Sequence, residues 1–117
     1  MVSPTYKQII RTIEELDEIG LEQFLEKYNF RPNIKYALIY EEKPYPPKAL
    51  WFRALERELP EKEYNPKWRK QGFGAPQIQY LRSIGFEVED FTKAIKNNSL
   101  NPKQLKILRM LGNAKKI

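Results

Sequence analysis

The stretch that decides the fold is KYALIYEEKPYPPKALWF, residues 35–52. Residues 36–40 are β-forming side chains with an apolar two-residue period, which predicts a strand with apolar side chains on both faces. Polar residues at 41–44 predict a turn. Pro46 and Pro47 cannot lie inside a central strand, but proline suits the first turn of a helix, where its missing N–H would have no partner. The stretch therefore predicts a strand, a turn and a helix in immediate succession.

Lys48 falls in the first turn of this predicted helix. A cation there opposes the helix dipole, which is unfavourable unless an anion binds beside it, as phosphates do at helix N-termini. The alternative is an ordinary solvated surface lysine. Lys48 is therefore a candidate phosphate contact.

The flanking sequence contains start and stop signals for further helices. Ser3-Pro4 combines an N-cap residue with a proline suited to the first helical position, and Gly20 is a typical residue to end that helix. Asn101-Pro102 repeats the start signal near the C-terminus. In chain order, we expect helices over residues 4–19, 21–29, 47–59, 75–85, 91–96 and 102–111, an irregular segment at 61–74 and a short strand at 86–88.

These elements predict a small α+β domain, rich in helices. Its short antiparallel sheet would pair residues 36–41 with 86–88, with a third segment near Tyr45. We expect residues 1–89 to form the domain and residues 90–117 to form a basic helical C-terminal extension.

Composition excludes several classes of catalytic site. The 117 residues contain no cysteine and no histidine, which rules out disulfides, Cys- or His-based zinc sites and Ser-His or Cys-His nucleophile systems. No GxxxxGK[ST] or GxGxxG phosphate-binding motif is present. Glu41-Glu42-Lys43, with Asp17 upstream, has the spacing of a carboxylate-type metal nuclease, but it lies in a predicted turn. We therefore expect no enzymatic activity, no cofactor and no metal.

The chain also lacks the signals of a membrane or exported protein. No apolar run reaches the length of a membrane span, and the N-terminus has no signal-peptide core. We expect a cytoplasmic protein without a membrane partner. Abundant Lys and Glu without Cys are typical of thermophiles.

The net charge of +6 is unevenly distributed. Residues 1–60 carry 9 Lys+Arg against 10 Asp+Glu, a net charge of −1, whereas residues 61–117 carry 12 against 5, a net charge of +7. This asymmetry indicates an anionic partner, most often nucleic acid. The alternative is a surface that is merely basic.

Two basic segments are the candidate DNA contacts. The segment 64–74 interleaves aromatic and basic side chains, which can stack on bases and neutralise phosphates. The polar face of the last predicted helix is also basic, and Tyr45 is a candidate base or sugar contact. The predicted DNA-binding residues are Tyr45, Lys48, Lys67, Trp68, Arg69, Lys70, Lys103, Lys106 and Arg109. If six to eight phosphates are neutralised, affinity should fall by roughly 10³- to 10⁴-fold between 50 and 200 mM salt.

Three alternatives give these residues other roles. Trp68 and Phe73 could fold into the core instead of facing DNA. The last helix could dock on a partner or dimerise through its leucines, which would make the chain a protein-interaction module. The leucines concerned are Leu105, Leu108 and Leu111. Finally, an aromatic pocket near Tyr36, Tyr40 and Trp51 could hold a small ligand.

Residues 16–88 resemble a known domain. The order LDEIGLEQFLEKYNF, YALIYEEKPYPPKAL, GFG and YLRSIGFEV is similar to the N-terminal head domain of McrA-like modification-dependent restriction endonucleases, which are HNH-type nucleases. The glycine pair of the family's loop is split here, as Gly72-Phe73-Gly74. The residues that carry the resemblance are Phe24, Leu25, Tyr28, Phe30, Tyr36, Leu38, Tyr45, Lys48, Ala49, Phe73, Gly74, Leu81, Gly85 and Phe86.

The resemblance implies a DNA-binding accessory domain of a restriction system that helps a nuclease engage duplex DNA, which adds weight to Lys48. No nuclease domain follows in this chain, so we expect a stand-alone binder, a piece of a longer enzyme or a subunit that acts with a separate nuclease. Because phosphate contacts carry no sequence information, the predicted residues do not by themselves specify a base sequence or a modified base. No oligomeric state follows from the sequence.

Overall fold

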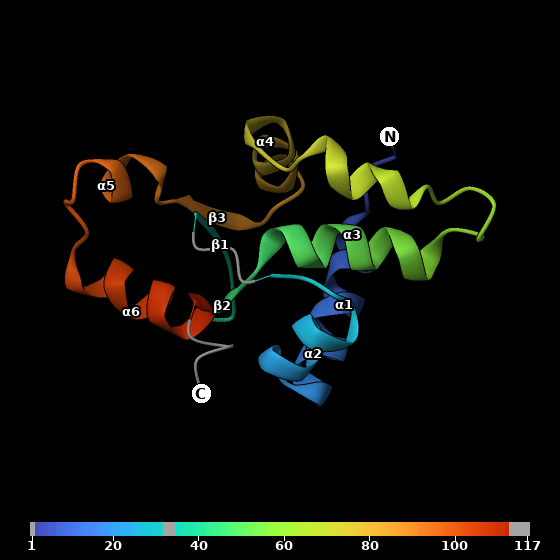
Figure 1. The fold of residues 1–117 in the computed structure, drawn as a ribbon, viewed down its shortest axis with the longest axis horizontal. Helices are drawn as coiled ribbons and strands as arrows, with labels where there is room; N and C mark the ends of the chain where they lie inside the picture. Colours follow the sequence, from blue (N-terminus) through green and yellow to red (C-terminus); the bar gives the residue numbers. More distant parts are fainter. Residues whose placement is uncertain (1, 32–34, 113–117) are drawn as a thin grey trace.

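The computed structural model describes residues 2–31 and 35–112. Figure 1 shows a three-stranded sheet near the centre of the molecule, with helices on both sides of it. The chain runs in the order α1 (Tyr6–Ile19), α2 (Leu21–Lys27), β1 (Tyr36–Tyr40), β2 (Lys43–Tyr45), α3 (Pro47–Glu58), the 3₁₀ helix η1 (Pro66–Gln71), α4 (Ala75–Ser83), β3 (Glu87–Asp90), α5 (Thr92–Lys96) and α6 (Pro102–Gly112).

The sheet confirms the predicted α+β class. Its strands lie in the order β2-β1-β3, and both pairings are antiparallel. Leu38 at the centre of β1 is opposite Tyr45 on one side and Val88 on the other, so the expected third segment near Tyr45 is the strand β2.

Both faces of β1 are covered, which explains its apolar residues on both sides. Leu38 lies in the main core, together with buried residues of α1, α2, α3 and α4. Its neighbour Ala37 points the other way and packs with Phe91, Ile107 and Leu111 in a second cluster. The segment expected as a basic extension therefore supplies α6, which closes the second face of the sheet. In Figure 1, α6 and α1 lie on opposite sides of the strands.

The leucines of α6 do not form one exposed stripe. Leu111 is buried and Leu108 is half-buried within the second cluster, whereas Leu105 is 38% exposed. The helix begins as predicted, because Asn101 and Gln104 exchange backbone-to-side-chain hydrogen bonds of 2.8 and 3.0 Å. Most of the apolar face expected to dock on a partner is thus used within the fold.

Two local predictions were wrong. Helix α1 is capped by Thr5, which forms a capping box with Gln8, and not by Ser3. Pro4 is buried instead, and its carbonyl accepts a hydrogen bond of 2.7 Å from the hydroxyl of Tyr80. The segment expected to be irregular contains η1, where the amide of Lys67 donates a hydrogen bond of 2.9 Å to the side chain of Asn65.

The predicted acidic turn is a strained hairpin. Glu41 and Glu42 connect β1 to β2 as a two-residue loop, with φ of 49° and 66°. Two consecutive positive φ values are those of a type I′ turn, which favours Asn-Gly. Among the described residues, no group of three or more Asp or Glu side chains could hold a metal ion.

The E41N/E42G variant should raise the free energy of unfolding by about 1 kcal/mol, because Asn and Gly adopt positive φ at lower cost than Glu. The change would be measured as a higher midpoint of urea unfolding. E61N/K62G places the same residues in an exposed turn without positive φ, and it should give no gain. Equal midpoints for E41N/E42G and the unaltered protein would show that the hairpin is not strained.

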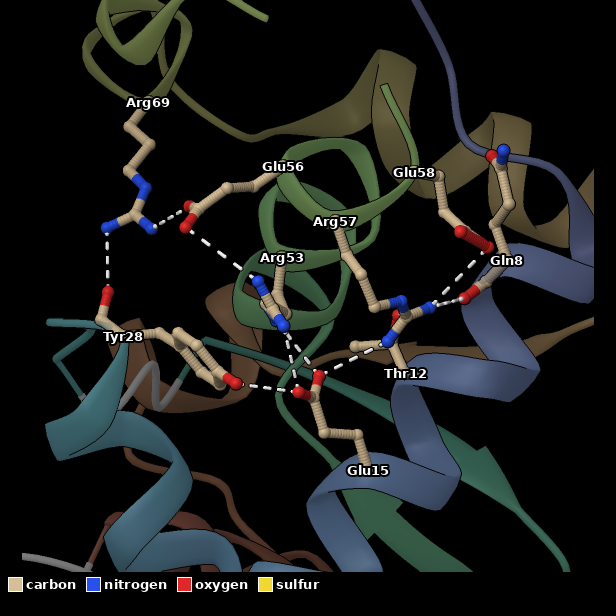
Figure 2. A network of polar contacts seen from close by, with 9 residues as sticks. All are labelled: Gln8, Thr12, Glu15, Tyr28, Arg53, Glu56, Arg57, Glu58 and Arg69. Atoms are coloured by element: carbon tan, nitrogen blue, oxygen red, sulfur yellow. Dashed lines mark hydrogen bonds and ion pairs between the residues drawn. The ribbon is translucent and has the colours of Figure 1, made fainter. Parts of the chain in front are cut away.

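A network of hydrogen bonds and ion pairs joins α1 to α3 (Figure 2). The carboxylate of Glu15 accepts hydrogen bonds of 2.9 Å from Arg53, 3.2 Å from Arg57 and 2.6 Å from the hydroxyl of Tyr28. Arg57 also donates to Thr12 at 3.0 Å. Burial alone would raise the pKa of Glu15, but the hydrogen bonds from Arg53 and Tyr28 and the positive charges outweigh it and hold this pKa at about 2. The network fixes the position of α3 relative to α1.

Among the described residues, none of the helices combines the length and apolar character needed to cross a membrane.

Candidate nucleic-acid interface

A groove with a basic lining lies where the N-terminus of α3 meets the start of β1, the end of α2 and η1. Its volume is about 810 Å³. Five of its lining residues are cations, and none is acidic. The groove is lined by Asn29, Phe30, Arg31, Lys35, Tyr36, Pro46, Lys48, Ala49, Arg69, Lys70 and Phe73. We call this the basic groove.

The N-terminus of α3 opens into the basic groove. Pro46 is the N-cap residue and Pro47 is the first helical residue, so Lys48 lies in the first turn as predicted. The first helical hydrogen bond runs from the amide of Leu50 to the carbonyl of Pro46, at 3.1 Å. The amide groups of Lys48 and Ala49 precede it, and both residues line the groove. No acidic residue occupies this first turn, so the positive end of the helix dipole is not offset there.

Arg69 lines the basic groove and connects the elements that form it. Its guanidinium donates to the carbonyl of Tyr28 and to the carboxylate of Glu56, both at 2.9 Å (Figure 2). It also lies 3.9 Å from the centre of the Phe30 ring. The predicted DNA contact Arg69 is therefore engaged within the protein, where it ties η1 to the end of α2 and to α3.

The structure places the other predicted residues of the 64–70 segment in different environments. Lys70 is exposed and lines the basic groove. Lys67 is exposed but is not among the lining residues. Trp68 is half-buried against Tyr64, with ring centroids 5.6 Å apart, so part of its surface belongs to the core as the alternative prediction stated.

Tyr45, expected to contact a base or sugar, is a core residue. It is 3% exposed, and its hydroxyl donates to the carboxylate of Asp17 at 2.8 Å. Burial, together with this hydrogen bond, raises the pKa of Tyr45. The ring has no free face to offer to DNA in this structure. Trp51 is likewise buried, packed against Phe73 and Tyr80, so it offers no face to the small ligand expected near it. Of the other two aromatic residues named for that pocket, Tyr36 lines the basic groove and Tyr40 does not.

The predicted cations of α6 lie away from the basic groove. Lys103 and Lys106 line a different cavity, of about 470 Å³, between α6 and the sheet. That cavity also contains acidic side chains, which offset the lysine charges. Arg109 is exposed and lines neither cavity. The acidic residues of the second cavity are Glu42, Glu87 and Glu89.

The structure thus brings Lys48, Arg69 and Lys70 together, although they come from two separate elements. It adds Arg31 and Lys35, which the sequence analysis missed. The signal available in the sequence was that both are cations a few positions before the predicted strand at residues 36–40.

Comparison with known proteins agrees with the resemblance seen in the sequence. Searches of curated proteins and of solved structures produced no match. The family model described as "ScoMcrA-like, N-terminal head domain" matches residues 3–90, from the segment before α1 to the end of β3. The match includes every element that builds the basic groove. The chain therefore belongs to the family of ScoMcrA-like N-terminal head domains.

Proposed function

We propose that this McrA-like, restriction-related head domain binds DNA through the phosphate backbone. The observation that carries the proposal is the basic groove, in which five cations and a helix N-terminus converge without a lining carboxylate. Phosphates are the ligands that both features favour. The net charge of +6 supplies the long-range attraction to DNA.

The role we propose is binding without catalysis. The side chains that line the basic groove are cationic, aromatic, aliphatic or amide groups, which suit a phosphate contact better than acid-base chemistry. The partner would be a nuclease domain or a separate nuclease subunit, which this domain would help to engage DNA. Backbone contacts give affinity and position, and the nuclease partner would then supply the sequence or modification specificity.

Fluorescence anisotropy with a labelled 20-base-pair duplex tests the proposal. Arg69 is paired with Glu56, and we expect Arg31, Lys48 and Lys70 to neutralise about three phosphates. Affinity should then fall about 40-fold between 50 and 200 mM salt, less than for six to eight phosphates. The same duplex with methylated cytosines should bind equally. An affinity that does not change with salt would contradict phosphate binding, and at least tenfold tighter binding of the methylated duplex would show that this domain itself reads the modification.

A further inference from the structure

We propose that the basic groove also holds one unpaired base, packed in the angle between the rings of Tyr36 and Phe73, face-to-face with one ring and edge-to-face with the other, with its phosphate at the start of α3. This inference deepens the proposed function and rests on it. The ligand class is a single-stranded or extrahelical nucleotide within DNA.

The aromatic side chains that line the groove are held in place by contacts with core aromatic residues. Tyr36 and Phe73 both line the groove and are both half-buried, so part of each ring remains open to it. Their ring centroids are 6.1 Å apart at an interplanar angle of 70°. Phe73 rests in turn on Trp51, at 5.8 Å, and Trp51 on Tyr80, at 5.5 Å. Because these rings are already held in place, little side-chain entropy would be lost when a base stacks on them.

The groove combines this aromatic surface with polar groups suited to a nucleotide. Lys48 and the start of α3 provide the phosphate contacts described above. Asn29 lines the same groove, and its side-chain amide can both donate to and accept from a base edge. The volume of about 810 Å³ lies within the range of roughly 300–1,000 Å³ typical of pockets for small molecules.

The aromatic lining distinguishes an unpaired base from a paired one. In a duplex, the faces of the bases are covered by their neighbours, and only phosphates, sugars and base edges are accessible. Aromatic side chains recognise base faces, which become available when a nucleotide is single-stranded or extruded. Duplex phosphates alone would make no use of the parts of the Tyr36 and Phe73 rings that remain open to the groove.

The test compares three labelled 20-base-pair DNAs by fluorescence anisotropy at 100 mM salt: a plain duplex, a duplex with one bulged thymidine and a duplex with one bulged abasic nucleotide. The two bulged DNAs have the same charge and number of nucleotides, and differ in chemical composition only by the bulged base. We expect the thymidine bulge to bind about tenfold more tightly than the abasic bulge.

The variant Y36L should abolish this tenfold preference, because leucine retains apolar volume but offers no aromatic face. Y40L is the matched control: Tyr40 lies on the same face of β1, packs against Phe86 and does not line the groove. It should retain the preference. F73L provides a second variant with the same expected loss if Y36L does not fold, as judged by circular dichroism.

Equal binding of the two bulged DNAs, or a tenfold preference that survives in both Y36L and F73L, would overturn the stacked-base inference. In either case, salt-dependent binding of the plain duplex would leave the phosphate-binding proposal intact. Failure of the protein to bind any of the three DNAs at 50 mM salt would overturn both proposals.

Discussion

The K48E/K70E variant should raise the Kd for duplex DNA about 100-fold at 100 mM salt, which corresponds to about 2.7 kcal/mol. Both lysines line the basic groove, one at the start of α3 and the other on η1. Reversing their charge should remove the two proposed phosphate contacts and add repulsion. The salt dependence should decrease by about one phosphate for each lysine. Anisotropy titrations at several salt concentrations measure both effects.

K7E/K62E is the matched control for this variant. Both double variants change the net charge from +6 to +2. Lys7 is the second residue of α1, as Lys48 is of α3, so the helix dipole favours glutamate equally at the two positions. Neither Lys7 nor Lys62 lines the groove, and the control should weaken binding less than threefold. Equal losses for the two variants would show that total charge, and not the basic groove, governs binding.

The E15Q variant should lower the free energy of unfolding by about 3 kcal/mol at pH 7. Glu15 is the shared acceptor of Arg53 and Arg57, and its side chain is only 22% exposed. A neutral amide would leave the two half-buried guanidinium groups with only their more distant carboxylate partners, Glu56 at 3.8 Å from Arg53 and Glu58 at 3.9 Å from Arg57. Urea unfolding followed by circular dichroism measures the change. E14Q alters the neighbouring exposed residue of α1 and should change stability by less than about 0.5 kcal/mol.

The stability difference between the unaltered protein and E15Q should depend on pH. The pKa of Glu15 in the folded protein is about 2, below its ordinary value of 4.5. A group with a lowered pKa stabilises the fold above the unfolded-state pKa and loses this effect as the pH falls toward the folded-state pKa. The difference should therefore be constant above about pH 5 and shrink between pH 4.5 and 2. A difference that persists unchanged at pH 2 would show that packing, and not ionisation, makes Glu15 important.

Features encoded by neighbouring residues were predictable from the sequence. The two-residue period of β1, the prolines before Lys48 and the Asn101 start signal predicted elements that the structure contains. The family resemblance was also carried by local motifs in order, and the family model confirms it. Caps and periodicity depend on residues a few positions apart, so they can be read along the chain.

The composition of the basic groove was decided only by the tertiary structure. Arg69 reaches the carbonyl of Tyr28, a separation of 41 residues, and this contact helps to determine which cations share a surface. Tyr45, a plausible DNA contact from its sequence position, is buried because β2 places it against α1. The lysines of α6 face acidic residues of the sheet for a similar reason. The local sequence determined that Lys48 lies in the first turn of α3. Packing between distant segments determined which side chains surround Lys48, because the partners of a polar side chain depend on how the whole chain folds.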